Sequence, residues 1–153
     1  MKTAEMGEDE MDRPFSCQML PVTILAGGRS RRMGEDKALI DFQGQPLIRR
    51  VIDLSSSISG KVSVVVHRDR LTSDRYRLLA AETGIELIPD DYDHQGPLGG
   101  MATAIRHHSH QPAILVLPCD MPFLTERLLR RLVICYTETT AEATILSDKD
   151  GFR

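Results

Sequence analysis

The sequence has no long apolar run, no excess of basic residues and little cysteine. A helix that crosses a membrane needs about 20 apolar residues in a row, and no stretch of the 153 residues approaches that length. Lys and Arg number 19 against 22 Asp and Glu, which gives a formal net charge of -3 and no general attraction to polyanions. We therefore expect a soluble protein that binds neither nucleic acid nor a membrane.

Cysteines are few, widely spaced and odd in number: Cys17, Cys119 and Cys135. The chain has no CxxC pair and no apolar leader segment before them, so we expect reduced thiols and a cytoplasmic protein. No general base is identifiable for Cys119, and we interpret it as a small buried strand residue without chemistry of its own.

Two common phosphate-binding loops are also missing. No segment has the spacing GxGxxG, and none matches GxxxxGK[ST]. This disfavours a dinucleotide-dependent dehydrogenase and a P-loop GTPase.

The chain divides into an acidic tail and one globular domain. Residues 1–19 hold five carboxylates among few apolar side chains, so ordering them would bury too little surface to offset the entropy lost. We expect 1–19 to be a disordered tail and 20–153 to be the domain, whose size and 41% hydrophobic content suit a single core.

Short apolar runs alternate with helical patterns from residue 22 onward. The runs predict strands at 22–26, 61–66, 85–88 and 113–118, and the segments after them predict helices from about 46, around 73–82, from about 98 and from about 125. This order predicts an α/β fold, a largely parallel sheet covered by helices on both faces with right-handed crossovers. Thr125 is placed to cap the last helix.

Ligands of such folds bind outside the carboxyl ends of the strands. In this sequence those ends carry Gly27-Gly28, His67, Asp90 and Cys119-Asp120. For His67, a solvated loop side chain and a ligand contact are equally open. Asp120 could bind a metal ion, since Mg2+ needs only one or two carboxylates beside substrate phosphates, or it could cap the next helix, for which Thr125 is better placed. The motif described below favours the metal.

The segment from Leu25 to Ile48 holds paired glycines, three arginines and a lysine, LAGGRSRRMGEDKALIDFQGQPLI. Glycines let main-chain N-H groups approach a ligand closely, and the cations supply the charge that a triphosphate requires. A solvated surface turn is the plainer alternative, but the strand end, the glycines and Lys37 together favour a phosphate site.

This segment resembles the signature LAGGxSxRMGxDKxLxxxxGxPL of the molybdenum cofactor guanylyltransferases, the MobA-like nucleotidyltransferases. The resemblance continues through Asp90, GPLGGM at 96–101 and LPCDMPF at 117–123, so it covers roughly residues 20–135. It implies a three-layer α/β/α sandwich of the nucleotide-diphospho-sugar transferase type.

The resemblance also implies roles for individual residues. Lys37, Asp120 and Arg32 would be catalytic, with Arg31 an alternative to Arg32, and Asp120 would hold Mg2+. Nucleotide contacts would come from Leu25, Ala26, Gly27, Gly28, Arg29, Lys37, His67, Asp90, Gly96 and Asp120. The family often has asparagine where this chain has His67.

The activity implied is transfer of GMP from GTP to the molybdenum-molybdopterin cofactor, with release of pyrophosphate and dependence on Mg2+. Proteins of molybdenum cofactor biosynthesis, or the apoenzymes that receive the product, are possible partners. A cytidylyltransferase or a sugar-phosphate nucleotidyltransferase of the same fold is the alternative enzyme, although the paired glycines and the Asp36-Lys37 step favour the guanylyl branch.

A nucleotide-binding fragment without turnover is the alternative from another class. Residues 143–153 predict a strand that enters a turn at Asp150-Gly151 with only two residues after it. We therefore expect the domain to be incomplete at its C-terminus.

Two further clusters have two interpretations each. Gly96, Gly99 and Gly100 could open a helix N-terminus to an anion or serve close packing. His107, His108 and His110 suggest a metal site, but a solvated helix end is favoured because no Cys or carboxylate partner lies at ligand spacing.

Overall fold

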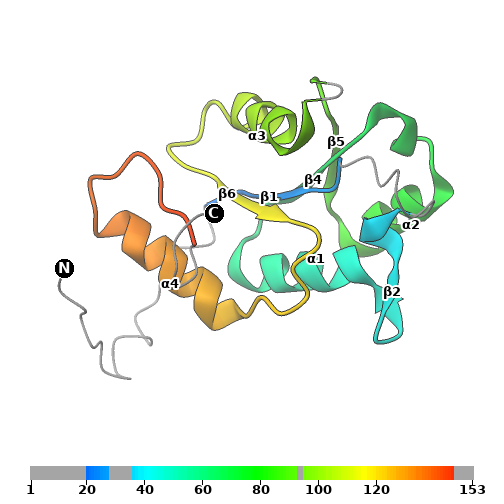
Figure 1. The fold of residues 1–153 in the computed structure, drawn as a ribbon, viewed down its shortest axis with the longest axis horizontal. Helices are drawn as coiled ribbons and strands as arrows, with labels where there is room; N and C mark the ends of the chain where they lie inside the picture. The colour runs from blue at the N-terminus through cyan, green and yellow to red at the C-terminus, as the bar shows by residue number, and fades with distance from the viewer. Residues whose placement is uncertain (1–19, 28–35, 93–94, 147–153) are drawn as a thin grey trace.

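Four parallel strands form the centre of the domain, seen edge-on in Figure 1. A computed structural model of the chain describes residues 20–27, 36–92 and 95–146. The strands are β1 (Val22–Leu25), β4 (Val62–Val66), β5 (Glu86–Pro89) and β6 (Leu115–Pro118), and their order in the sheet is β5-β4-β1-β6. Every pairing in this sheet is parallel, as the sequence predicts.

Helices cover both faces of the sheet (Figure 1). One face carries α1 (Leu47–Ile58), α2 (Asp74–Thr83) and α4 (Glu126–Thr137), and the other carries α3 (Gly96–His107). Because side chains alternate along a strand, β4 sends Val64 and Val66 into the three-helix core and Val65 into the smaller core under α3. The predicted three-layer α/β/α sandwich is confirmed.

The apolar stripe of α3 faces solvent rather than the sheet. Leu98, Met101 and Ile105 are 73%, 40% and 59% exposed, whereas Thr103 and Ala104 are buried together with two glycines of the same helix. Small side chains let the helix axis approach the sheet closely, which turns the larger residues outward. Periodicity therefore predicted the helix, but its large apolar side chains do not mark the face that it buries.

Four short elements lie between the main ones and were not predicted. The strands β2 (Asp41–Phe42) and β3 (Gln45–Pro46) form a hairpin whose turn has positive φ at Gln43 and Gly44, the geometry of a tight two-residue hairpin turn. Two single 3-10 turns follow strand ends, η3 (Lys37–Leu39) after β1 and η4 (Arg68–Arg70) after β4.

The ends of the predicted elements also differ in places. Pro46 stands at the N-cap of α1 rather than inside its first turn, while Thr125 caps α4 as predicted by accepting from the Leu128 N-H at 3.3 Å. Residues 143–146 form no strand, and the predicted turn at Asp150-Gly151 lies outside the described residues. The same holds for the predicted tail at 1–19. Across the ranges the structure describes, no helix is both long and apolar enough to cross a bilayer.

Candidate functional site

The carboxyl ends of the strands lie at one edge because their registers match. Leu25 of β1 pairs with Val65 on one side and Pro118 on the other, and Val66 pairs with Pro89. The residues that follow, Ala26, His67, Asp90 and Cys119 among them, therefore leave the sheet together. The strand order reverses between β1 and β6, and such a switch point is where open α/β sheets bind ligands.

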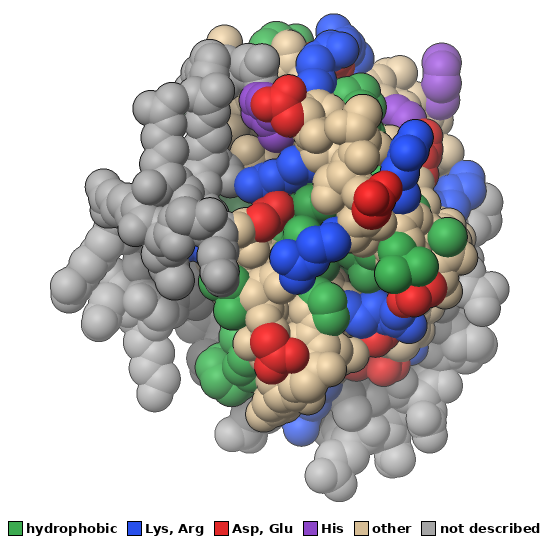
Figure 2. Space-filling view, turned by 90° about the vertical axis from the view of Figure 1, so that its right-hand side faces the viewer, with side chains coloured by type: hydrophobic (Ala, Val, Ile, Leu, Met, Phe, Trp, Pro, Cys, Tyr) green, Lys and Arg blue, Asp and Glu red, His purple; other side chains and the backbone are tan. Residues whose placement is uncertain are grey.

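This edge carries charged side chains of both signs. It faces the viewer in Figure 2, where acidic and basic side chains alternate over the described surface. A mixed field of this kind suits a ligand that brings both phosphates and a metal ion better than it suits a polyanion alone. The positions of the individual carboxylates and cations show which of them could contact such a ligand.

Asp90 is a buried carboxylate, 8% exposed, held by its own neighbours. Its Oδ1 accepts the Tyr92 N-H and the Thr103 hydroxyl, each at 3.0 Å. Its Oδ2 faces Gly27, where an added Cβ would lie 3.3 Å away. Asp90 and the end of β1 are thus in contact, and glycine at 27 keeps that oxygen uncrowded.

Lys37 is exposed and opens the η3 turn, which begins directly after the capping residue Asp36. The Asp36 carboxylate accepts the Ala38 N-H at 3.2 Å, and Ala38 and Leu39 are buried in the core. The turn is therefore anchored on its apolar side, and the lysine is left on its solvent side.

His67 forms the N-cap of η4 at the end of β4. Its Nδ1 accepts the Asp69 N-H at 3.3 Å and lies 3.2 Å from the Asp69 carboxylate, and its side chain is only 18% exposed. The His67 side chain therefore caps η4 and is not freely solvated, which was one of the two expectations for it. Contact with a nucleotide stays a prediction.

The GPLGGM glycines divide into two kinds. At Gly99 a Cβ would lie 2.8 Å from the Tyr92 carbonyl oxygen, and at Gly100 it would lie 3.2 Å from Leu25, so close packing accounts for both. Gly96 has a φ of +62° with open space around it, so its position reflects backbone conformation. The predicted contact of Gly96 with the nucleotide is untested.

Asp120 is exposed and follows β6, beside the half-buried Cys119. Burial, and next the carboxylates Asp120 and Asp36, raise the pKa of the Cys119 thiol to about 11. Both carboxylates are therefore near this sulfur. An exposed carboxylate at the switch point fits a Mg2+ ion, which keeps several waters and takes further oxygens from substrate phosphates. In the part of the chain that is described, no three acidic, His or Cys side chains form a complete metal cluster.

The sequence analysis missed Arg70 and Tyr76, two residues at this edge. Arg70 Nε lies 3.0 Å from Asp36 Oδ2, and the Tyr76 hydroxyl donates to the same oxygen at 2.9 Å. A guanidinium of Arg70 also donates to the Ala26 carbonyl. An arginine and a tyrosine in predicted loop and helix segments do not reveal from sequence alone that both contact Asp36.

Several predicted residues lie outside the described ranges. These are Gly28, Arg29, Arg31 and Arg32, all within 28–35. Their predicted contacts with phosphates are neither supported nor opposed by the structure.

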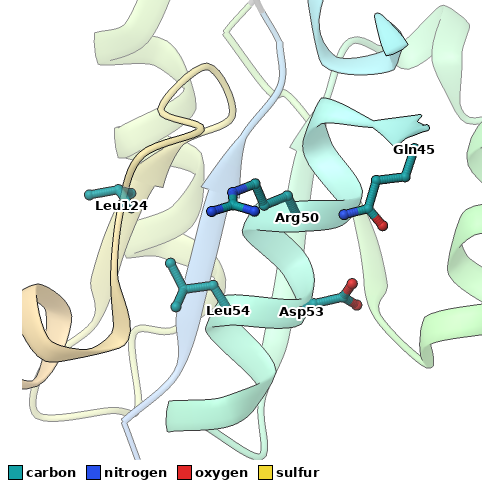
Figure 3. A pocket seen from close by; sticks show the side chains of 5 residues that line it. All are labelled: Gln45, Arg50, Asp53, Leu54 and Leu124. Atoms are coloured by element: carbon teal, nitrogen blue, oxygen red, sulfur yellow. The ribbon is translucent and has the colours of Figure 1, made fainter. Parts of the chain in front are cut away.

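A hollow of about 260 Å³ lies between α1 and the segment that carries Leu124, and none of the predicted nucleotide residues lines it. Figure 3 shows Arg50 and Leu54 extending from α1 toward the segment that carries Leu124, with Gln45 and Asp53 on the other side. Arg50 Nε donates to the Pro122 carbonyl, and its guanidinium lies 5.9 Å from the Phe42 ring centroid. The arginine thereby ties α1 to the loop after β6 and to the β2-β3 hairpin.

The histidines at the end of α3 are bonded to the sheet. His107 Nε2 lies 3.1 Å from Glu86 Oε2, and His108 Nε2 lies 3.3 Å from Ser63 Oγ, while His110 is exposed. Burial, followed by the charge of His107, lowers the pKa of His108. His107 and His110 are exposed at the end of α3, as a solvated helix end predicts, and His108 is partly buried. The contacts with Glu86 and Ser63 link this end of α3 to β5 and β4.

The position of Cys119 predicts slow and pH-dependent alkylation. Because the thiolate is the nucleophile and the pKa is about 11, the rate with iodoacetamide should rise about tenfold per pH unit between pH 7 and 10. The exposed Cys135 is the internal reference. Peptide mapping by mass spectrometry measures both rates, and equal labelling of the two cysteines at pH 7 would contradict the assigned environment of Cys119.

Comparison with known proteins gives the family. The family model described as a MobA-like NTP transferase domain matches residues 22–153. A molybdenum cofactor guanylyltransferase of Shewanella piezotolerans is 35% identical over 131 residues, which are 84% of this chain and 60% of that protein. The chain thus spans about 60% of the length of this curated relative.

Solved structures agree on the fold. The molybdopterin-guanine dinucleotide biosynthesis protein A of Archaeoglobus fulgidus superposes with a TM-score of 0.55 at 26% identity, covering 74% of this chain and 53% of that one. The CTP complex of a CMP:2-keto-3-deoxy-manno-octonic acid synthetase gives a TM-score of 0.62 at 21% identity over 80% of this chain and 48% of that one, a likeness of fold alone. With the family match over most of its length, this chain belongs to the MobA-like NTP transferase domain family.

Proposed function

We propose that this chain binds GTP at the carboxyl edge of its sheet and transfers GMP to molybdenum-molybdopterin. The observation that carries the proposal is the contact between the position of Gly27 and Asp90 Oδ2 at the carboxyl edge of the sheet, where β6 also ends just before Asp120. We infer that Lys37, at the start of η3, completes this site. The names of the relatives, molybdenum cofactor guanylyltransferase and molybdopterin-guanine dinucleotide biosynthesis protein A, supply the acceptor and the base.

The reaction needs no protein nucleophile. A terminal phosphate oxygen of the acceptor attacks the α-phosphorus of GTP, a new P-O bond forms, the bond to the β-phosphate bridge breaks, and pyrophosphate leaves. Catalysis of this kind is alignment together with neutralisation of charge on the phosphoryl groups. The high pKa of Cys119 keeps that thiol protonated at neutral pH and agrees with its having no chemical role.

Each described residue has a part in this scheme. The backbone of Leu25, Ala26 and Gly27 approaches the nucleotide, and Lys37 binds its phosphates. Asp90 accepts from the guanine or the ribose through Oδ2, which faces Gly27. Asp120 is the ligand for Mg2+, which when bound offsets negative charge on the triphosphate. In this proposal His67 and Gly96 also contact the nucleotide. Gly28, Arg29 and the catalytic Arg32 take part as well, although they lie outside the described ranges.

Binding of nucleotide without turnover is the second candidate. The chain spans only about 60% of its relative's length. In this alternative the carboxyl edge of the sheet binds the nucleotide, and no acceptor phosphate reacts with it.

Titration with four nucleotides tests the proposal. In the presence of Mg2+, calorimetry should detect GTP binding at least tenfold tighter than that of CTP, ATP or UTP. Addition of molybdenum-loaded cofactor should then release pyrophosphate. GTP binding without pyrophosphate release supports the non-catalytic alternative, preference for CTP supports a cytidylyltransferase, and absence of any nucleotide binding overturns both candidates.

Replacement of Lys37 should weaken binding of the phosphates. Lys37→Ala removes charge-assisted contacts worth about 1.5 to 3 kcal/mol each, so GTP affinity or turnover should fall from about tenfold to over a hundredfold. Lys61→Ala is the matched control, because Lys61 is an exposed lysine at the start of β4 and hence at the opposite edge. GTP affinity within threefold of the parent in both variants would place Lys37 away from the phosphates.

Neutralising Asp120 should change the metal requirement above all. Asp120→Asn keeps the shape of the side chain and removes its charge, so half-maximal GTP binding should need roughly tenfold more Mg2+ while saturating Mg2+ restores much of the affinity. Glu142→Gln, at an exposed carboxylate beyond α4, serves as the control. An unaltered Mg2+ titration for Asp120→Asn would remove this residue from the metal site.

A further inference from the structure

Arg70 links the end of β1 to the η3 turn, the two segments that carry Gly27 and Lys37 of the proposed phosphate site. Arg70 ends η4, yet its guanidinium reaches the main chain of another segment by donating to the carbonyl oxygen of Ala26, directly after β1. Its Nε lies 3.0 Å from Asp36 Oδ2. Ala26 precedes Gly27, and Asp36 precedes Lys37, so Arg70 links the residues that border both parts of the site.

Both oxygens of the Asp36 carboxylate accept from neighbouring groups in this arrangement. Oδ2 receives Arg70 Nε and the Tyr76 hydroxyl, the latter at 2.9 Å, while Oδ1 receives the Ala38 N-H at 3.2 Å. Tyr76 is 1% exposed, and burial together with the neighbouring Asp36 charge raises its pKa well above the ordinary value. The tyrosine therefore stays a hydrogen-bond donor, and Asp36 serves as an anchor.

We propose that Arg70, supported by Tyr76, is a positioning residue that holds η3, with Lys37 at its start, against the carboxyl end of β1. The inference rests on the proposed function, since it assumes that this edge receives a nucleoside triphosphate. Arg70 touches no substrate in this scheme and acts on affinity through Lys37. Nothing in the local sequence around residue 70 indicates this role.

A guanidinium suits the task better than an ammonium would. Its planar fork donates in several fixed directions and can serve a carboxylate and a carbonyl at once, whereas lysine offers a point charge on a flexible stem. The side chains of Arg70 and Asp36 are each only 19% exposed, so solvent screens their attraction less than that of a surface pair. The guanidinium also lies 6.0 Å from the Tyr76 ring centroid, within range of a cation-π contact.

The test compares GTP and GMP binding in four variants. Arg70→Lys keeps the charge but loses the two-way bridge, so GTP affinity should fall roughly tenfold while GMP affinity changes less than threefold, because Lys37 acts on the outer phosphates. Tyr76→Phe keeps the buried ring and removes one donor, and a smaller loss for GTP alone is expected. Lys37→Ala and the double variant Lys37→Ala/Arg70→Lys complete a cycle in which Arg70→Lys should have almost no further effect once Lys37 is absent.

Arg130→Lys is the matched control for the chemistry of the substitution. Arg130 also bonds a carboxylate, Glu126 Oε1 at 2.7 Å, and a main-chain carbonyl, that of Ser57 at 3.5 Å, but it does so on α4. Its replacement should leave GTP binding unchanged. Thermal unfolding of every variant establishes that the compared proteins are folded.

The outcomes separate this inference from the function on which it rests. If the parent binds no GTP, the proposed function fails. If the parent binds GTP but Arg70→Lys and Tyr76→Phe bind it equally well, the positioning role is wrong and the function stands. A loss that is the same for GTP and GMP, or that adds fully to the Lys37→Ala loss, also overturns the positioning role, because either result means that Arg70 does not act through Lys37.

Discussion

Parallel pairing of β1 with both of its neighbours is the constraint from which the rest of the structure follows. The register sets Leu25 beside Val65 and Pro118, so three segments leave the sheet at the same level and on the same edge. Side chains alternate across a strand, and a slip of one residue would exchange Ile24 with Leu25 between the two cores. The buried apolar faces thus fix the height at which Gly27 and Asp120 emerge.

The two faces of the sheet fulfil different requirements. On one side, branched and aromatic side chains of α1, α2 and α4 form a thick core, with Ile48, Ile52 and Leu129 almost fully buried. On the other side α3 packs through glycine, threonine and alanine, and Leu25 contacts the helix where Gly100 has no side chain. Close approach of α3 draws its first turn and Thr103 toward the edge. Thr103 can then bond Asp90 and aim the second oxygen of that carboxylate at Gly27.

The sequence was informative wherever one segment carries its own signal. Apolar runs predicted all four strands of the main sheet, periodicity predicted all four helices, and polar residues at strand ends predicted the edge on which Asp90 and Asp120 lie. It was less informative on α3, where small residues pack against the sheet and the large apolar residues face solvent. It also gave no signal for β2 and β3, because two-residue strands are too short to show alternation. Contacts such as Arg70 with Asp36 join segments 34 residues apart, and only tertiary structure brings them together. Residues 28–35 lie outside the described ranges, so the arginines predicted there were not tested.

The adjacent residues Asp36 and Lys37 divide two tasks that one residue could not fulfil. Asp36 turns inward, where Arg70 and Tyr76 balance its charge and its Oδ1 caps the η3 turn. Since that charge is balanced from within the protein, it cancels little of the positive charge that Lys37 presents on the exposed side of the turn. The anchored turn thereby fixes the backbone position from which the Lys37 side chain extends into solvent. An anchored backbone reduces the freedom that a bound phosphate must remove from the lysine, so less of the electrostatic attraction is spent on ordering it.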